Sequence, residues 1–145
     1  MSEDNCLFCR IVSGEVPATL VYVDENSVAF LDHRPLFYGH TLLVPREHVE
    51  TLVELPQKFV GPFFETVQLL ARAVEQAMKA EGTFVAMNNR VSQSVPHLHV
   101  HVVPRRKKDG LKGFFWPRTK YKDEEEMKVV QRQIAASLKE LAHQK

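Results

Sequence analysis

The 145-residue chain has neither a long hydrophobic run nor a strong net charge. No apolar stretch approaches the roughly 20 residues that a membrane-spanning helix needs, and the acidic, polar N-terminus is unlike a signal peptide. We therefore expect a cytoplasmic protein with no membrane partner. The formal net charge of +1 provides no global field that would attract nucleic acid, so none is expected as the main partner.

Cysteine is also scarce, because the chain has only Cys6 and Cys9, which form a Cys-x-x-Cys pair. A structural disulfide is disfavoured in a cytosolic chain. A thioredoxin-like redox motif would follow a β-strand, and no strand-like segment precedes this pair. Two interpretations are left open: two buried thiols, or half of a zinc site that needs two further ligands.

Internal repeats and low-complexity segments are absent, and the composition is that of one ordinary globular domain. Hydrophobic periodicity predicts a long helix from 56 to about 80 and a last helix from about 123. Gly61-Pro62 leaves a later start of the long helix open, since proline suits only the first turn. Because the strands mostly follow one another without intervening helices, the pattern favours an antiparallel α+β sheet. Four of the predicted strands are 20–23, 28–31, 41–44 and 83–87.

The most informative segment is 96–104, where His97, His99 and His101 occupy every second position. Side chains of a β-strand alternate between its two faces, so a fifth strand here would place all three imidazoles on one face. Three interpretations compete: a solvated polar face, a metal site, and covalent catalysis by one imidazole. The residues between the histidines would enter a core from the other face: Leu98, Val100 and Val102.

This run resembles the signature of the histidine triad (HIT) family of nucleotide hydrolases and transferases. Further motifs of that family occur in the usual order, and the match spans about residues 6–105. They are Cys6–Ile11, Gly14–Pro17, Phe30–Asp32, Gly39–Pro45, His48 and Gln93–Val95. The resemblance implies a HIT-like fold with a five-stranded antiparallel sheet, one long helix and a C-terminal helix. It also implies a single domain over 1–145, with a variable tail over 106–145, and a two-fold homodimer.

The resemblance further implies a mechanism in which His99 attacks the α-phosphorus of a nucleotide. A covalent nucleotidyl-histidine would form, and water would hydrolyse it. The other catalytic residues implied are His101, His40 and Ser94, and the nucleotide contacts are Asp32, Asn88, Gln93, Ser94, His99 and His101. Structural alternatives stay open: Asp32 as a strand-end cap, Gln93 and Ser94 as an ordinary turn, and His40 as a core histidine.

In one branch of the family, the residues matching Cys6, Cys9, His48 and His97 bind zinc. Four thiolate and imidazole ligands close a tetrahedral site with no open position, which is typical of structural zinc. The chemistry itself would then require no cofactor, since His99 and His101 stay free. The rival interpretation is a hydrolase that binds a catalytic metal through the triad.

The chain departs from the family pattern in two ways just before Gln93. Ser92 occupies a position where the family often has glycine, and the loop that contains it looks short, so the placement of Gln93 is open. His101 is kept, whereas transferase relatives tend to carry glutamine there, which favours hydrolysis. We expect release of AMP from an adenine nucleotide conjugate. The basic and aromatic segment 105–118 favours a dinucleoside polyphosphate; the alternatives are a nucleoside phosphoramidate, or nucleotide binding without turnover.

Overall fold

The structure is a computed structural model that describes residues 3–111 and 118–143. The chain divides into two compact units, residues 1–109 and 110–145, which are described separately below. The predicted single domain over 1–145 stays a prediction. The elements are η1 (Glu3–Asn5), α1 (Leu7–Val12), β1 (Leu20–Val23), β2 (Ser27–Leu31), β3 (Thr41–Pro45), η2 (Leu52–Glu54), α2 (Gln57–Ala77), β4 (Gly82–Ala86), β5 (Val100–Arg105) and α3 (Glu124–Ala142).

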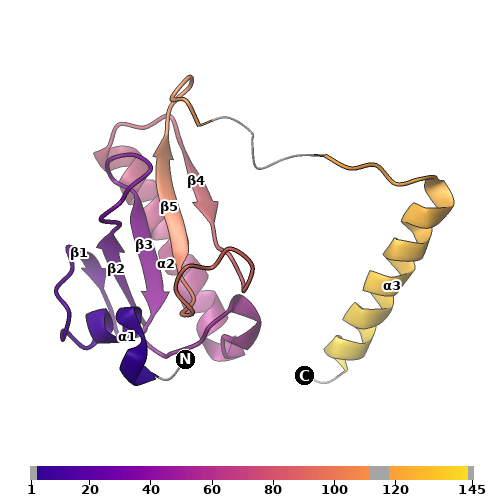
Figure 1. The fold of residues 1–145 in the computed structure, drawn as a ribbon, viewed down its shortest axis with the longest axis horizontal. Helices are drawn as coiled ribbons and strands as arrows, with labels where there is room; N and C mark the ends of the chain where they lie inside the picture. The colour runs from indigo at the N-terminus through magenta and orange to yellow at the C-terminus, as the bar shows by residue number, and fades with distance from the viewer. Residues whose placement is uncertain (1–2, 112–117, 144–145) are drawn as a thin grey trace. The chain divides into compact units, whose positions relative to one another are not determined.

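The first unit is built on a five-stranded sheet in the order β1-β2-β3-β5-β4, with every neighbouring pair antiparallel. The predicted α+β class and antiparallel sheet are confirmed. Helix α2 lies against one face of this sheet (Figure 1), where it covers a core that includes Leu43, Leu98 and Val100. A smaller core on the other face joins α1 to β2 and β3 through Phe8, Phe30 and Leu42. The alternation of side chains in the histidine run therefore separates these two cores.

The fifth strand begins later than the sequence predicts, at Val100, so His97 and His99 precede it. Pairing with β3 extends only from Val102 to Val100, because the next groups find other partners. The N–H of Leu98 donates to the carbonyl of Val49 at 2.7 Å, and the His97 ring bonds the carbonyl of Pro45 at 2.9 Å. The faces are nevertheless as predicted, since Leu98 and Val102 are buried in the α2-side core.

Helix α2 begins at Gln57, close to the predicted start at 56, and Gly61-Pro62 does not delay it. Proline at position 62 removes the bond to the carbonyl of Lys58. Both Lys58 and Pro62 are exposed, which leaves that carbonyl open to water and lets the helix continue. The hydrophobic periodicity that predicts this helix marks its buried side, because Phe63, Val67, Leu70 and Val74 are among its buried residues.

In the second unit, α3 begins as the sequence predicts. The Asp123 side chain accepts from the N–H of Glu126 at 2.8 Å, and the Glu126 carboxylate accepts from the N–H of Lys122 at 2.7 Å. The apolar side chains whose spacing predicts this helix include Ile134 and Leu138, which keep 58% and 63% of their accessible surface. Within the described residues, no helix is long and apolar enough to cross a membrane. Much of the basic and aromatic segment, residues 112–117, lies outside the described residues.

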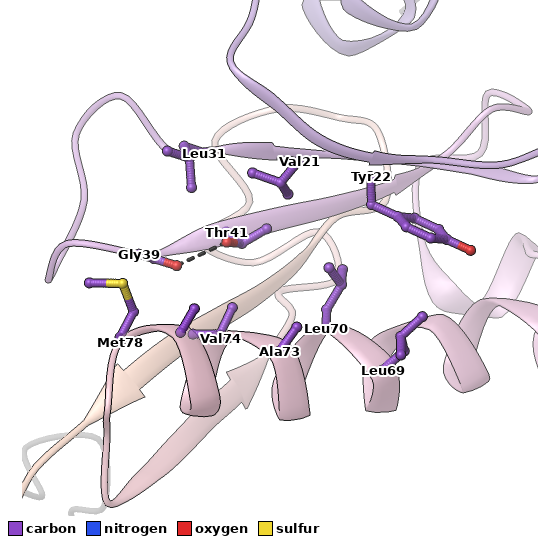
Figure 2. Close-up of a pocket in the computed structure, with 11 residues that line it drawn as sticks. Val21, Tyr22, Leu31, Gly39, Thr41, Leu69, Leu70, Ala73, Val74 and Met78 are labelled. Atoms are coloured by element: carbon purple, nitrogen blue, oxygen red, sulfur yellow. Dashed lines mark hydrogen bonds between the residues drawn. The ribbon is translucent and has the colours of Figure 1, made fainter.

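An apolar groove of about 390 Å³ lies between α2 and strands β1–β3, on the α2 side of the sheet. At one end of this groove Gly39 approaches Met78 (Figure 2), and its φ is +99°. A Cβ at this position would lie 2.6 Å from Met78 Cγ, so both the backbone and the packing require glycine. Gly39 thus delivers the chain to the neighbouring His40.

We expect Gly39→Ala to lower the free energy of unfolding by about 2 kcal/mol, because alanine is strained at this φ and displaces Met78. The measurement is denaturant-induced unfolding at equilibrium. Gly82→Ala is the matched control, since a Cβ there meets nothing within 4 Å. Equal stabilities of the two variants would contradict the account of Gly39.

Candidate functional site

A cavity of about 680 Å³ opens on the sheet face opposite α2. Its size falls in the range typical of small-molecule sites. One part is apolar, with walls from α1 and β2 that include Leu7, Phe8, Ile11 and Phe30. The other part is polar and brings together four predicted site residues, Asp32, Ser94, His99 and His101. The structure therefore places residues from distant parts of the chain around one cavity.

The hydrogen bond of His99 determines which of its nitrogens is basic. Its Nδ1 lies 2.8 Å from the carbonyl oxygen of His97, and a carbonyl can only accept. Nδ1 therefore carries the proton and donates, which leaves the lone pair on Nε2. His99 is 3% exposed, and burial lowers its pKa from the ordinary value of 6.5. The imidazole is accordingly neutral at pH 7, with a nucleophilic Nε2 in the cavity wall.

His40 and His101 form a second hydrogen-bonded chain. The backbone N–H of Leu36 donates to His40 Nδ1 at 3.1 Å, so the proton of neutral His40 is on Nε2. That Nε2 lies 2.9 Å from His101 Nδ1 and donates to it. The proton of His101 is therefore on its own Nε2. Burial lowers the pKa of His40, and burial with neighbouring histidines lowers that of His101 to about 4.

The other predicted nucleotide contacts are arranged differently. Asp32 lines the cavity and also caps a turn, because its Oδ1 accepts from the N–H of Arg34 at 2.9 Å. Asn88 and Gln93 do not line the cavity: the Asn88 amide donates to the carbonyl of Ser92 at 3.1 Å, and that of Gln93 to the carbonyl of Glu50 at 2.6 Å. Their roles toward a nucleotide stay predictions. Ser92 has a φ of +60°, which explains why glycine suits this position.

Sequence reasoning missed several groups that the site uses. The apolar wall from α1 and the backbone groups of Leu36 and Pro45 were not among the predicted site residues. The apolar spacing of Leu7, Phe8 and Ile11 was a visible signal for the wall. Backbone partners leave no signal in the sequence, because every residue type offers the same carbonyl and all but proline offer the same N–H.

Cys6, Cys9, His48 and His97 converge, and their ligand atoms all lie within 4.8 Å of one another. His97 Nε2 donates to the carbonyl of Pro45, which leaves the Nδ1 lone pair facing the cluster. That Nδ1 is 3.3 Å from His48 Nδ1 and 3.4 Å from each cysteine sulfur. Two imidazole nitrogens bound to one tetrahedral zinc lie about 3.3 Å apart, so the donor set fits the ion.

The electrostatics of this cluster also favour a cation. Burial, together with the Cys6 side chain, raises the pKa of the Cys9 thiol to about 12. Two thiolates side by side repel unless a positive charge lies between them, and a bound metal deprotonates its thiol ligands. His48 Nε2 is buried without a hydrogen-bond partner among the described residues, so this ring is held on its Nδ1 side.

The histidine arrangement and the sheet are those of a known family, and a family model for the HIT domain matches residues 13–108. The chain belongs to the HIT domain family. This HIT protein is 36% identical to "Protein hit" of Bacillus subtilis over 78% of this chain and 79% of that one. It is 31% identical to an adenosine 5'-monophosphoramidase of Schizosaccharomyces pombe, covering 93% and 99% of the two chains. A zinc-bound histidine triad family protein from Mycobacterium smegmatis has a TM-score of 0.71 and 36% identity, covering 97% and 99%.

A second group of metal-type ligands in the HIT protein, Asp32, His40 and His101, also lies within 4.8 Å. Here the hydrogen bonds disfavour an ion. The N–H of Leu36 occupies the lone pair of His40 Nδ1, so His40 Nε2 carries a proton and has no lone pair for a metal. Of the triad itself, His97 turns its lone pair to the cysteine cluster, and the lone pair of His101 accepts from His40. These two commitments disfavour the rival interpretation of a catalytic metal bound by the triad.

The lowered pKa of His101 predicts how stability depends on pH. As the pH is lowered, the unfolded chain binds a proton at this residue near pH 6.5, whereas the folded chain does so only near pH 4. The free energy of unfolding therefore decreases as the pH decreases across this window. Between about pH 7 and pH 5 we expect His101 to contribute a loss of about 1–2 kcal/mol. Urea unfolding of wild type and His101→Gln at both pH values checks this. A slope that is unchanged in the variant would be evidence against the buried neutral imidazole.

Proposed function

We propose that this HIT protein is a nucleotidyl hydrolase that cleaves adenine nucleotide conjugates at the α-phosphate. The observation that carries the proposal is a pair of imidazoles in one cavity, of which one has a basic Nε2 and the other a protonated Nε2. His99 presents a basic Nε2, because its Nδ1–H donates to the carbonyl of His97, and His101 carries a proton on its Nε2. A nucleophile beside a hydrogen-bond donor is what substitution at a phosphate requires.

The proposed reaction has two steps. In the first, the lone pair of His99 Nε2 forms a bond to the α-phosphorus, and the bond from phosphorus to the leaving group breaks. The leaving group takes the electron pair and a proton, for which the Ser94 hydroxyl at the cavity edge is the proposed donor. In the second, water attacks phosphorus and gives a proton to the Ser94 oxygen, the N–P bond breaks with its electron pair returning to His99 Nε2, and a nucleoside monophosphate leaves. His101 Nε2–H donates to a phosphate oxygen in both steps, where negative charge accumulates.

The remaining parts of the cavity fit the rest of a nucleotide. The apolar walls from α1 and β2 suit a base, and Asp32 offers a carboxylate oxygen to the ribose hydroxyls. The four-ligand cluster would hold zinc through Cys6, Cys9, His48 and His97, and the ion supplies a rigid crosslink rather than a reacting group. The homodimer and the roles of Asn88 and Gln93 stay predictions.

The leaving group is the open part of this proposal. Two cations that favoured a polyphosphate have partners within the fold: Arg105 pairs with Asp109 at 2.6 Å, and Arg106 bonds the carbonyl of Met78. The similarity to an adenosine 5'-monophosphoramidase favours a phosphoramidate. We therefore rank the nucleoside phosphoramidate first and the dinucleoside polyphosphate second.

The test is to incubate the protein separately with adenosine 5'-phosphoramidate and with a dinucleoside tetraphosphate. We expect release of AMP, with the faster turnover on the phosphoramidate, and a rapidly quenched sample should contain protein heavier by one adenylyl group. Peptide mapping should locate that group on His99. Nucleotide binding without turnover of either substrate, and without an adduct, would contradict the proposal and support a binding protein.

A further inference from the structure

Phe8 lies between the four-ligand cluster and the cavity that contains His99. It belongs to α1, in the two-residue interval between Cys6 and Cys9, and is 5% exposed. Its ring centroid is 5.1 Å from that of His99, with an interplanar angle of 83°, and 6.0 Å from that of His97, at 73°. Among the described residues, Phe8 is the phenylalanine whose ring contacts both histidines.

The imidazole of His99 needs more than its hydrogen bond to stay in place. The hydrogen bond from Nδ1–H to the His97 carbonyl holds one edge of the ring. Rotation of the ring about its Cβ–Cγ bond would break this hydrogen bond. The His101 ring packs at 5.0 Å from the imidazole, and Phe8 packs perpendicular to it. An edge-to-face contact with an aromatic ring restricts rotation, since the rings interlock at close packing density.

The position of Phe8 is in turn set by its neighbours in α1. The Cys6 side chain caps this helix by accepting from the N–H of Cys9 at 3.4 Å. Both cysteine sulfurs belong to the four-ligand cluster, so the cluster holds the chain on either side of Phe8. Phe30 supports the ring from β2, with centroids 5.4 Å apart.

We propose that Phe8 is a positioning residue that keeps the His99 imidazole in its attacking orientation, and that it connects the cysteine cluster to the nucleophile. The inference rests on the proposed function in taking His99 as the nucleophile. Phe8 also lines the cavity, but its proposed role is directed at the protein's own imidazole. A substitution at Phe8 leaves the reacting groups unchanged. It alters only the fraction of molecules in which the His99 imidazole is correctly oriented.

The test is Phe8→Leu in the metal-loaded protein, compared with Phe30→Leu as the matched variant. Phe30 is equally buried and contacts Phe8, but no ring contact joins it to His99. For Phe8→Leu we expect the rate constant of adduct formation at saturating phosphoramidate to fall about 10- to 100-fold, with a smaller change in apparent Kd. For Phe30→Leu we expect the reverse, a weakened Kd with less effect on the rate constant. Phe8→Tyr, which keeps the ring, should restore most of the rate.

A second readout does not depend on turnover. In wild type the His99 Nδ1 proton should give a slowly exchanging signal in NMR spectra of ¹⁵N-histidine-labelled protein, because it is buried and hydrogen-bonded. Phe8→Leu should broaden or remove that signal while metal content stays equal to wild type. An unchanged signal, or a rate constant no lower than that of Phe30→Leu, would overturn the proposal. If wild type forms no adduct, the proposed function fails, and the His99 signal alone decides the role of Phe8.

Discussion

Replacing His99 by alanine is expected to lower turnover of adenosine phosphoramidate at least about 10⁴-fold, because the covalent route loses its nucleophile. The effect should be this large because His99 lines the cavity as a buried neutral imidazole whose Nδ1–H is bonded, which leaves the lone pair on Nε2. His40 Nε2 is protonated and donates to His101, and the only lone pair of His101 is on Nδ1, which accepts that bond. Neither histidine is therefore able to replace His99 without breaking the chain.

The measurement is steady-state turnover together with the mass of quenched protein. His99→Ala should show no adenylyl adduct, although AMP binding should persist, since the apolar wall and Asp32 are intact. His143→Ala makes the same chemical change at an exposed position near the end of α3 and should behave as wild type. Near-normal turnover in His99→Ala would show that another group attacks phosphorus.

Replacing Cys6 by serine is expected to remove bound zinc and to lower the free energy of unfolding by about 3–5 kcal/mol. Metal binding contributes to folding wherever the site exists only in the folded chain, and this cluster joins residues up to 91 positions apart. The cysteine is fully buried, so serine would also bury a hydroxyl with a weaker partner. Metal analysis and chemical denaturation check the two parts of the prediction.

Wild type treated with a strong chelator is the control for this prediction. If the metal accounts for the effect, chelation should lower the stability of wild type toward that of Cys6→Ser and change the variant little. Cys9→Ser should reproduce the loss. A Cys6→Ser protein that keeps one zinc per chain would show that the ion is held elsewhere. A variant as stable as wild type would contradict the structural role of the zinc.

The period of two in the histidine run was sufficient to separate the faces of the sheet. Leu98, Val100 and Val102 are in the α2-side core as predicted, because hydrophobic burial acts on each side chain locally. The start of β5 was not predictable in the same way, since it depends on where β3 stops pairing and on the carbonyls of Val49 and Pro45. Whether Gly61-Pro62 delays α2 was not predictable either, because the helix tolerates this proline on a solvent-facing side, and orientation toward water is a tertiary property.

The predicted site residues do not all meet at one site, because tertiary contacts also decide where each side chain lies. Asp32, Ser94, His99 and His101 meet at one cavity, and the four metal-type ligands meet at another point of the fold. Gln93 has its amide on the carbonyl of Glu50, 43 residues away in the chain, a partner that no local pattern contains. The basic and aromatic segment cannot be compared over residues 112–117, which lie outside the described residues.

The sequence by itself determined the class of fold, the family and the identity of the chemical groups, since these depend on residue type and spacing. Only the tertiary structure decided what each imidazole does. His97 points its lone pair at two cysteines, His99 keeps a basic nitrogen for the cavity, and His101 offers a proton there. The reason is physical: a neutral imidazole has one donor and one acceptor nitrogen, and its distant hydrogen-bond partners decide which is which.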